Sequence, residues 1–564
     1  MQNNKLPLSE YPRPQLVRDS YICLNGVWEY AIRDNEAIPD VFDGHILVPF
    51  SPESEKSGVN RFVSPEEWLF YKRSIDFPTG FIKDKVILHF TAVDQIADIY
   101  VNNEHVFHHE GGYLPFEFDI KPYLKEKNEL IVKVKDYSET KFYCRGKQRI
   151  DTGGIGIWYH PQSGIWMPVW MESVSSDYIE GIKITPNFDE ESISLFIKSE
   201  AKEAIVDIFE KSLKIETNKN ITLKVDNMHP WSPEDPYLYD LEVKTVGDSV
   251  KSYFAMRKIS FLKDEKNRKR IALNNKIYFI KGVLDQGYYK DTLLTPRKDE
   301  DYINDIQTMK EMGFNALRKH IKVESLRYYY YCDKLGMLVW QDFLNGGDVY
   351  KKITIHLPLF DHIHHKDWRH GYFARKSKEG RELWIQEMEK LVNYLYNSPC
   401  IILWTIFNEG WGQFDAKKML PLVKEWDNTR LIDPHSGWHD QYIGDFKSLH
   451  VYYVRAKAPW PWRRKKRCFI FSEIGGYTLR IEGHDNLNPD ELFSYKNLTT
   501  KESLIEEYKT FIEKDIKRLI PKGLSAFIYT QLSDVESELN GFITFDREVV
   551  KIEPETIKNI NESI

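Results

Sequence analysis

IILWTIFNEGWG (residues 401–412) and CFIFSEIGG (residues 468–476) are two strongly apolar runs, and each carries a glutamate close to glycine near its end. Runs of this kind, with helical periodicity between them, predict buried strands of an alternating β and α region. Six further strands are expected in this region, at residues 278–283, 316–320, 338–342, 431–435, 448–453 and 526–532. The resulting eight strands predict a (β/α)8 TIM barrel over residues 266–564, with a doubly wound sheet as the alternative.

The chain before residue 266 has a different pattern, with short β runs and no long helical periodicity. Residues 86–90, 97–101 and 129–134 are such runs, separated by turn residues. This pattern predicts a β-sandwich over residues 1–175. A smaller set of candidate strands predicts an immunoglobulin-like β-sandwich over residues 176–265. The 564 residues therefore predict a multidomain β plus α/β chain.

Composition limits the functions that this chain can carry. Hydrophobic residues make up 42% and charged residues 29%, as in ordinary globular proteins, and the net charge of −7 argues against nucleic acid as a partner. The five cysteines are scattered and include no CxxC pair, so neither a disulfide framework nor a structural zinc is expected. No leader-like segment and no run of about 20 apolar residues occurs, so we expect a cytoplasmic protein without a membrane span.

The two glutamates at the strand ends predict the chemistry. Catalytic side chains of a barrel gather at the carboxyl ends of the strands, so Glu409 and Glu473 should face each other across one mouth. Glycosidic cleavage needs such a pair of carboxyl groups. Glu409 lies between Trp404 and Trp411, where desolvation would keep it protonated as the acid. Glu473 would stay ionised as the nucleophile if Arg318, at the end of an earlier strand, lies beside it.

Five motifs spread along the chain resemble those of one known family. They are PRPQLVRDSYICLNGVWEY at residues 12–30, GGYLPFEFDI at 111–120, GIWMPVWME at 164–172, FAMRKI at 254–259 and FIKGV at 279–283. With the two glutamate motifs, they resemble glycoside hydrolase family 2, which includes β-galactosidases, β-glucuronidases and β-mannosidases. The resemblance implies that the first sandwich is a sugar-binding jelly roll. It also implies a retaining exo-β-glycosidase, with Glu409 as acid/base and Glu473 as nucleophile. No cofactor is expected.

The same resemblance implies roles for further residues at the barrel mouth. Asn408 should bond the sugar 2-hydroxyl, Tyr452 should touch the nucleophile, and Arg318 matches an arginine of the second strand. The chain departs from the family pattern at Gln286, where many members have histidine, and at His320, which is displaced by one position. The expected substrate-binding residues are Asn408, Arg318, His320, Tyr452, Asp285, Gln286, Trp411, Trp438 and Tyr529.

These departures leave the sugar open. A terminal β-galactoside is the default substrate, and a β-glucuronide or a β-mannoside is the alternative within the family. A carbohydrate-binding protein with a non-catalytic barrel is the alternative from another class. The expected partner is an oligosaccharide or small glycoside, and the family resemblance is compatible with a homo-oligomer.

Three other segments could border the same mouth. Trp438 follows the fifth strand, in a loop that either contacts substrate or simply packs. Residues 343–378 form a long insertion with several histidines, but their spacing does not match a zinc site, and no metal is expected. Trp460, Trp462 and the basic run at residues 463–467 lie between the sixth and seventh strands, where they could meet an anionic sugar.

Overall fold

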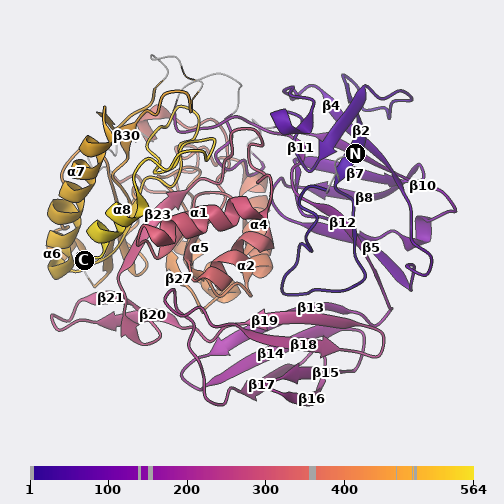
Figure 1. The fold of residues 1–564 in the computed structure, drawn as a ribbon, viewed down its shortest axis with the longest axis horizontal. Helices are drawn as coiled ribbons and strands as arrows, with labels where there is room; N and C mark the ends of the chain where they lie inside the picture. Colours follow the sequence, from indigo (N-terminus) through magenta and orange to yellow (C-terminus); the bar gives the residue numbers. More distant parts are fainter. Residues whose placement is uncertain are drawn as a thin grey trace.

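The computed structural model describes residues 6–137, 142–149, 156–354, 364–464, 466–485, 487 and 492–564. Figure 1 shows two bodies built from strands and a third that combines strands with helices. The predicted fold class is confirmed, because the sheets form two β-sandwiches and an eight-stranded parallel barrel. Within the described residues, none of the helices has both the length and the apolar character needed to cross a membrane.

The N-terminal sandwich consists of two antiparallel sheets that enclose one apolar core. Its four-stranded sheet has the order β1 (Ile22–Cys23), β12 (Val169–Val174), β5 (Lys85–Phe90) and β9 (Phe116–Asp119). Its six-stranded sheet has the order β3 (Gly44–Val48), β2 (Gly26–Arg33), β4 (Trp68–Ile75), β10 (Asn128–Lys135), β7 (Ile96–Val101) and β8 (Glu104–Glu110). The strands predicted at residues 86–90, 97–101 and 129–134 are confirmed as parts of β5, β7 and β10.

Short elements complete this sandwich. They are the paired strands β6 (Val93–Asp94) and β11 (Gly164–Ile165) and the single-turn helices η1 (Glu55–Ser57) and η2 (Lys121–Tyr123). The pair β6 and β11 lies on the side of the sandwich next to the barrel, because Trp166, directly after β11, packs in the barrel's apolar cluster.

The second sandwich also has two antiparallel sheets with a core of their own. One sheet contains β13 (Ile179–Asn187), β14 (Ser192–Ser199) and β17 (Asn220–Lys224), and the other contains β16 (Lys211–Glu216), β15 (Glu203–Ile208), β18 (Tyr239–Lys244) and β19 (Ser249–Phe254). The apolar pattern predicts strands at residues 182–184, 192–197, 221–225 and 237–244, which agree with β13, β14, β17 and β18, but it does not predict β15, β16 or β19. Charged residues on the exposed faces of β15 and β16 interrupt their apolar pattern, which explains why these strands are hard to recognise.

The barrel is built from eight parallel strands, and all eight were predicted. Their order around the sheet is β27 (Leu431–Asp433), β26 (Ile401–Thr405), β25 (Leu338–Asp342), β24 (Ala316–Lys319), β23 (Ile280–Asp285), β32 (Leu524–Tyr529), β29 (Cys468–Ile474) and β28 (Phe446–Val451). The two end strands, β27 and β28, approach each other, so the sheet nearly closes on itself. This closure excludes the doubly wound alternative.

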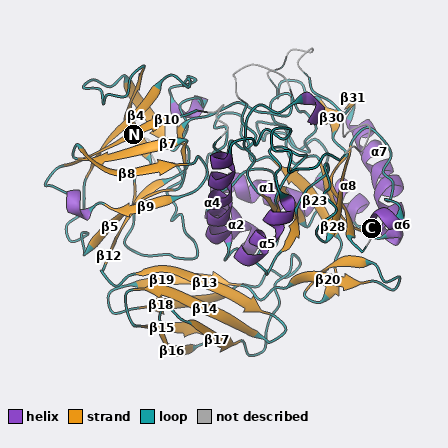
Figure 2. Ribbon diagram, turned by 180° about the vertical axis from the view of Figure 1, so that it is seen from behind, coloured by secondary structure: helices purple, strands orange, loops and turns teal. Residues whose placement is uncertain are grey.

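Helices surround the barrel strands, as Figure 2 shows. They are α1 (Asp299–Glu311), α2 (Leu326–Leu335), α4 (Lys378–Leu395), α5 (Ala416–Trp426), α6 (Pro461–Arg464), α7 (Lys501–Phe511) and α8 (Pro554–Asn561). After α7 the chain continues through a π-helical turn, η4 (Ile512–Ile516), and a 3-10 turn, η5 (Lys517–Lys522). The helical periodicity between the strands includes the buried apolar residues of α4 and of the α7 to η5 segment, which repeat at 3.6-residue spacing.

Two small sheets lie outside the barrel. The first contains β20 (Ile259–Lys263), β21 (Lys269–Leu273) and β22 (Lys276–Ile277), and the second pairs β30 (Tyr477–Leu479) with β31 (Lys496–Leu498). Strand β21 packs against β29 and β32, and Figure 1 shows β20 and β21 together beside the lower end of the barrel. The hairpin directly precedes β23 and therefore lies at the amino ends of the strands, which leaves the carboxyl ends to form the mouth.

The three bodies share segments that cross between them. Leu16 packs in the core of the second sandwich, and Val17 pairs with Lys251 of β19. The predicted domain limits at residues 175 and 265 therefore stay predictions.

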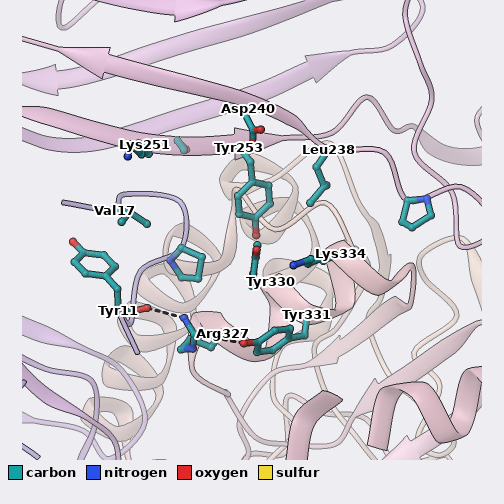
Figure 3. A pocket seen from close by; sticks show the side chains of 13 residues that line it. Tyr11, Val17, Leu238, Asp240, Lys251, Tyr253, Arg327, Tyr330, Tyr331 and Lys334 are labelled. Carbon is teal, nitrogen blue, oxygen red and sulfur yellow. Dashed lines mark hydrogen bonds between the residues drawn. The ribbon is translucent and has the colours of Figure 1, made fainter. Parts of the chain in front are cut away.

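A cavity of about 630 Å³ lies where the N-terminal segment that contains Val17, the second sandwich and α2 meet (Figure 3). Arg327 at its wall donates to the Tyr11 carbonyl at 3.0 Å and to the Tyr331 hydroxyl at 2.7 Å.

Trp231 fastens the second sandwich to the barrel. Its side chain is fully buried in the barrel's apolar cluster, although it belongs to the turn that precedes β18. The backbone N–H donates to the Met256 carbonyl at 2.8 Å, and the indole Nε1 donates to the Asp333 carbonyl at 2.8 Å. Trp231 thus joins three parts of the chain, namely its own turn, the segment after β19 that contains Met256, and helix α2.

We expect Trp231→Ala to lower the free energy of unfolding by about 3–5 kcal/mol, because it removes a large buried ring and a buried hydrogen bond. Urea denaturation followed by circular dichroism measures the loss. Trp462→Ala is the matched control, because Trp462 is 66% exposed and its loss should change stability by less than about 0.5 kcal/mol. Equal effects of the two substitutions would contradict this role of Trp231.

Candidate active site

Two glutamates meet at the carboxyl end of the barrel. Glu409 follows β26 and Glu473 lies in β29, and each is only 4% exposed. One carboxylate oxygen of each glutamate and one ring nitrogen of His450, from β28, all lie within 4.8 Å of one another. The sequence-based expectation that these carboxylates face each other across one mouth therefore agrees with the geometry.

Glu473 is surrounded by donors that favour its ionised form. Arg318 Nη1 donates to Oε1 at 3.0 Å, and the Tyr452 hydroxyl donates to Oε2 at 2.5 Å. Burial alone would raise the pKa of Glu473, but His450, Arg318 and Tyr452 together outweigh burial and hold this pKa below its usual value. The ring of Tyr452 stacks on Tyr495 at 4.4 Å, which fixes the direction of its hydroxyl.

Arg318 organises the residues around Glu473. The side chain, from β24, is fully buried and donates through Nε and Nη2 to Asp342 of β25 at 2.8–3.1 Å. Its Nη2 also donates to Asn408 Oδ1 at 2.8 Å, and its Nη1 donates to the Ser472 carbonyl at 2.9 Å. One guanidinium therefore positions the glutamate of β29 and the asparagine that precedes Glu409.

Glu409 has surroundings of the opposite kind. Its backbone adopts φ = 48°, in the left-handed region that few non-glycine residues occupy. The backbone N–H donates to the Ser436 carbonyl at 3.0 Å, which ties this turn to the loop after β27. Burial and the nearby Glu473 charge raise the pKa of Glu409 above its usual value, although the contact with His450 Nδ1 at 2.6 Å acts against this shift.

Two buried donors beside the pair, Asn408 Nδ2 and Trp411 Nε1, have no hydrogen-bond partner among the described residues. His320 Nε2 also has none, but it is an acceptor, because burial lowers the pKa of this ring and keeps it neutral, and its Nδ1–H donates to Gln286. His320 Nε2 lies 3.6 Å from Glu473 Oε1, and its Nδ1 is 2.8 Å from Gln286 Oε1. Gln286 in turn donates to Gln531 Oε1 at 2.8 Å. Such donors suit a ligand rich in hydroxyl groups, because buried polar groups otherwise cost free energy.

A segment of the N-terminal sandwich reaches the same site. Residues 142–149 cross to the barrel, where Cys144 pairs with Gly346 and Arg145 N–H donates to the Asn345 carbonyl at 3.2 Å. Gly146, at φ = 60°, is required in this segment, because a Cβ would lie 2.4 Å from the Tyr113 hydroxyl. The tight turn delivers the next residue, Lys147, to the barrel mouth.

Lys147 is a buried cation next to the carboxylate pair. Its Nζ lies 4.9–5.4 Å from the ring centroids of Trp158, Tyr159 and Trp411, and the side chain is 4% exposed. Within the described part of the chain, no carboxylate oxygen lies within 4.0 Å of this ammonium. Burial lowers the pKa of Lys147, while Glu538, Glu473 and Glu409 oppose this shift.

Two residues expected at the substrate site have their contacts elsewhere. Asp285 lies in a separate buried cluster, with Lys319 Nζ at 2.6 Å and the Tyr328 hydroxyl at 3.2 Å. Tyr529 packs in an aromatic cluster with Tyr508 and Phe542, and its ring fills the space below Gly475. Asp285 ends β23 and Tyr529 ends β32, whereas the strands were expected at residues 278–283 and 526–532, and the two side chains serve ion pairing and packing.

The loop after β27 does lie at the site. Trp438 is 8% exposed, and its ring centroid is 6.2 Å from that of His450. His439 Nε2 bonds the Thr354 carbonyl at 2.9 Å, so this loop also packs on the insertion after β25.

His356 and His362 of that insertion lie outside the described residues. His364 and His370 contact Tyr442 and Asp415, respectively.

Trp460 and Trp462 do not lie at the mouth, in contrast to the prediction. They belong to the segment of α6, which comes directly before β29 and therefore lies at the opposite end of that strand from Glu473. Their rings stack at 4.9 Å and are 62% and 66% exposed. Of the basic run, Arg467 forms an ion pair with Asp440 at 2.9 Å, whereas Lys465 and the side chains of residues 463 and 464 lie outside the described part.

Away from the carboxylate pair, potential metal donors gather in one place within the described residues. Atoms of His484, Asp546 and Glu548 come within 4.8 Å of one another at the partly exposed surface. His484 Nδ1 already bonds Asp546 at 3.0 Å, so the group forms an ordinary ion-pair cluster.

Sequence reasoning missed three residues of the site. His450 belongs to the run LHVYY at residues 449–453, of which only Tyr452 was expected at the site. Lys147 belongs to the segment RGKQR at residues 145–149, whose glycine between two cations was the available signal. Glu538 has no sequence signal, because it lies beyond the last strand and reaches the site only through folding.

Glu538 is the third acidic group near the pair. It is 2% exposed and accepts a hydrogen bond from the Tyr159 hydroxyl. Burial raises the pKa of Glu538 to about 7, although Lys147 acts against the shift. This carboxyl group therefore changes its protonation state near neutral pH.

Comparisons with known proteins agree with this architecture. A family model described as "Glycosyl hydrolases family 2, TIM barrel domain" matches residues 265–549. The sugar binding domain of the same family matches residues 52–155, and a third model, "Glycosyl hydrolases family 2", matches residues 185–257.

Individual proteins are also similar to this chain. A β-galactosidase of Thermoanaerobacter pseudethanolicus is 25% identical over 508 residues, which cover 82% of this chain and 62% of that protein. A β-glucuronidase structure from an uncultured Clostridium sp. has a TM-score of 0.76 at 17% identity and covers 98% of this chain and 99% of that chain. A β-galacturonidase structure from Eisenbergiella tayi, bound to galacturonate, has a TM-score of 0.72 at 16% identity over 98% of this chain and 99% of that chain. At these identities the two structures establish the fold alone.

The raised pKa of Glu538 makes stability depend on pH. In the unfolded chain this group ionises near its ordinary pKa of about 4.3, whereas the folded protein keeps the proton until about pH 7. The free energy of unfolding therefore falls as the pH rises from about 4.3 to about 7. Glu538→Gln, which imitates the protonated form, should raise the unfolding midpoint at pH 8 and change it little at pH 5. The expected gain at pH 8 is about 3 kcal/mol.

Thermal unfolding of both proteins at the two pH values measures this difference. Glu548→Gln is the matched control, because that glutamate lies at the surface with a side chain that is 71% exposed. A gain from Glu538→Gln that is equally large at pH 5 and pH 8 would contradict the proposed titration.

Proposed function

Because this chain belongs to family 2 of the glycosyl hydrolases, we propose that it hydrolyses terminal β-linked sugars by a retaining double displacement, with a β-galactoside as its substrate. The approach of a Glu409 oxygen to a Glu473 oxygen within 4.8 Å carries this proposal. Retaining enzymes hold their two carboxyl groups about 5–5.5 Å apart, whereas inverting enzymes leave about 6.5–9.5 Å for a water molecule. The close pair therefore supports retention.

The first step uses the opposite protonation states of the two glutamates. Ionised Glu473 attacks the anomeric carbon while the bond from that carbon to the leaving oxygen breaks. Glu409 transfers its proton to this oxygen, and a sugar ester of Glu473 remains. The lowered pKa of Glu473 favours the ionised nucleophile, and the raised pKa of Glu409 favours the protonated acid.

The second step reverses the role of Glu409. As a carboxylate, Glu409 removes a proton from a water molecule, and the water oxygen attacks the anomeric carbon. The ester bond to Glu473 breaks, so the sugar leaves with its original β configuration. Asn408 Nδ2 and Trp411 Nε1, which have no partners among the described residues, are available to bond sugar hydroxyl groups during both steps.

A neutral sugar suits the balance of charge at the site. Asp342 and Glu473 pair with Arg318, and Glu538 is the acidic group that acts most strongly on Lys147, so the site holds acidic groups for both of its cations and a neutral galactoside adds no charge. The name of the similar protein from Thermoanaerobacter pseudethanolicus, a β-galactosidase, supports the same substrate. The chain spans 62% of the length of that protein, so this support extends to the shared part.

A β-uronide is the second candidate substrate, and Lys147 favours it. Burying an ammonium group without a close counter-ion is unfavourable, and the carboxylate of a uronic acid would supply that counter-ion. The aromatic rings around Lys147 attract the cation but do not neutralise it. The sugar carboxylate would have to enter beside Trp411 to reach this group.

Turnover of nitrophenyl β-glycosides tests the proposed function directly. We expect release of nitrophenol from the β-galactoside, with the β anomer as the first product in proton NMR spectra. Glu473→Ala should abolish turnover. Glu409→Ala should lower the rate roughly 10²–10⁴-fold, because general acid catalysis is lost. Azide should then restore the rate of Glu409→Ala and yield a β-glycosyl azide.

The matched control is Glu548→Ala, which removes an exposed glutamate and should leave turnover unchanged. If the folded protein releases nitrophenol from none of the β-galactoside, β-glucuronide, β-galacturonide and β-mannoside, the proposed activity is wrong and a carbohydrate-binding role would be favoured. A first product with the α configuration would exclude retention.

Lys147→Met separates the two candidate substrates. If Lys147 pairs with a sugar carboxylate, the substitution should lower kcat/KM for a β-galacturonide or β-glucuronide at least tenfold more than for the β-galactoside, a difference of about 1.4 kcal/mol. Lys121→Met on the sandwich surface controls for the loss of a positive charge. An equal effect on neutral and acidic sugars would remove the uronide from consideration.

A further inference from the structure

His450 connects the two catalytic glutamates. Its Nδ1 lies 2.6 Å from Glu409 Oε1, and its Nε2 lies 3.6 Å from Glu473 Oε1. The side chain of His450 is fully buried. No other described imidazole comes this close to Glu409, so His450 is the basic side chain that decides how this carboxyl group is held.

The loop after β27 holds the His450 ring in place. Ser436 Oγ lies 2.8 Å from His450 Nε2, and the ring packs against Gly437. A Cβ at Gly437 would lie 2.8 Å from His450 Cγ, and its φ of 81° also favours glycine, so only glycine leaves room for the ring. The same Ser436 accepts the backbone N–H of Glu409 through its carbonyl oxygen. Histidine and glutamate are thus positioned by one turn.

The contact engages one oxygen of Glu409 and leaves the other free. The Tyr452 hydroxyl lies 3.5 Å from the same Oε1, whereas Oε2 has no hydrogen-bond partner among the residues that the structure describes. An acid must direct its proton toward the leaving oxygen of the substrate. If Oε1 carried the proton, that proton would point at His450 and not at the substrate.

We propose that His450 is the positioning residue for the acid/base Glu409: its Nδ1–H donates to Oε1, so the transferable proton sits on Oε2. A hydrogen on Nδ1 is present in the imidazolium form and in one neutral tautomer, and the Ser436 hydroxyl favours that tautomer by donating to Nε2. This inference rests on the proposed glycosidase function.

The same hydrogen bond acts in both steps. When the Oε2 proton moves to the leaving oxygen, the carbon–oxygen bond breaks and Glu409 becomes a carboxylate, which the Nδ1–H stabilises. When Glu409 Oε2 takes a proton from water in the second step, Nδ1–H still occupies Oε1. The proton therefore leaves and returns at one oxygen, and the glutamate does not have to rotate between the steps.

The pH dependence has a definite sign. The charged and titratable groups that face this pair are Glu473 of β29, Tyr452 directly after β28, Arg318 of β24, Lys147 of the crossing segment and Glu538. Removing the Nδ1–H donor destabilises the Glu409 carboxylate relative to its protonated form, so the pKa of Glu409 should rise. The basic limb of the rate profile, which reports loss of the Glu409 proton, should then move to higher pH.

The experiment compares His450→Ala and His450→Asn with the wild type on aryl β-glycosides of the sugar that the wild type hydrolyses. A phenyl leaving group needs the proton of Glu409, whereas a 2,4-dinitrophenyl group leaves without it. We expect His450→Ala to lower kcat/KM roughly 10²-fold for the phenyl glycoside and only a few-fold for the dinitrophenyl glycoside. The amide nitrogen of asparagine can stand where Nδ1 stands, so His450→Asn should recover most of the loss.

His450→Gln provides the matched comparison, because its longer amide reaches toward the Nε2 position and should not rescue the activity. Ser436→Ala should produce the same dependence on leaving group at smaller size, which keeps the test available if His450→Ala fails to fold. His105→Asn, at an exposed histidine of the N-terminal sandwich, should leave all rates unchanged.

The outcomes separate this inference from the function on which it rests. A wild type without turnover on any glycoside overturns both. A wild type with turnover whose His450 variants lose activity equally for phenyl and dinitrophenyl glycosides keeps the function and overturns the positioning role. The same conclusion would follow if His450→Asn were as impaired as His450→Ala.

Discussion

The fully buried guanidinium of Arg318 links the parts of the site that must stay in register. It donates to Asp342, Glu473 and Asn408, and to the carbonyl of Ser472. Removing an arginine from water is costly, and the cost is offset only when planar, well-directed hydrogen bonds satisfy its donors. Because these acceptors come from β25, from β29 and from the turn after β26, the position of each acceptor limits the positions of the others.

The opposite protonation states of the two glutamates follow from this arrangement. Both carboxyl groups are buried to the same extent, and burial alone would raise the pKa of each. Arg318 and Tyr452 bond Glu473 directly, whereas Glu409 contacts an imidazole and adopts a strained backbone. The different charges of neighbouring groups, and not a difference in burial, therefore divide the acid from the nucleophile.

Much of the barrel and of its carboxylate pair could be predicted from the sequence, because both depend on short continuous segments. The apolar runs before Glu409 and Glu473 marked buried strands, and the rule that strand ends share one mouth placed the two carboxylates together. The family resemblance, and not this rule, pointed to Asn408 and Tyr452, and in the structure Arg318 donates to Asn408 while Tyr452 donates to Glu473. The rule could not separate inward from outward side chains at Asp285 and Tyr529, because the last residue of a strand can turn either way. Asp285 turned toward Lys319, and Tyr529 turned into an aromatic core.

The contributions of Lys147 and Glu538 could not be predicted, because neither belongs to a barrel strand. Lys147 depends on docking between two domains, and Glu538 depends on a long turn after the final strand. His450 was accessible in principle, since it lies two residues before Tyr452 on a recognised strand. Its importance becomes visible only when the loop after β27 is seen to hold its ring.

The crossing segment at residues 142–149 has a consequence for how such a molecule can change over evolutionary time. The two reactive glutamates belong to the barrel, whereas Lys147 beside them is supplied by a segment of the N-terminal sandwich. Recombination or drift in the sandwich could therefore alter which sugars are accepted while the reactive carboxylates stay untouched. Conversely, a barrel excised from its neighbours would keep both glutamates and lose a cation that helps decide what they act upon.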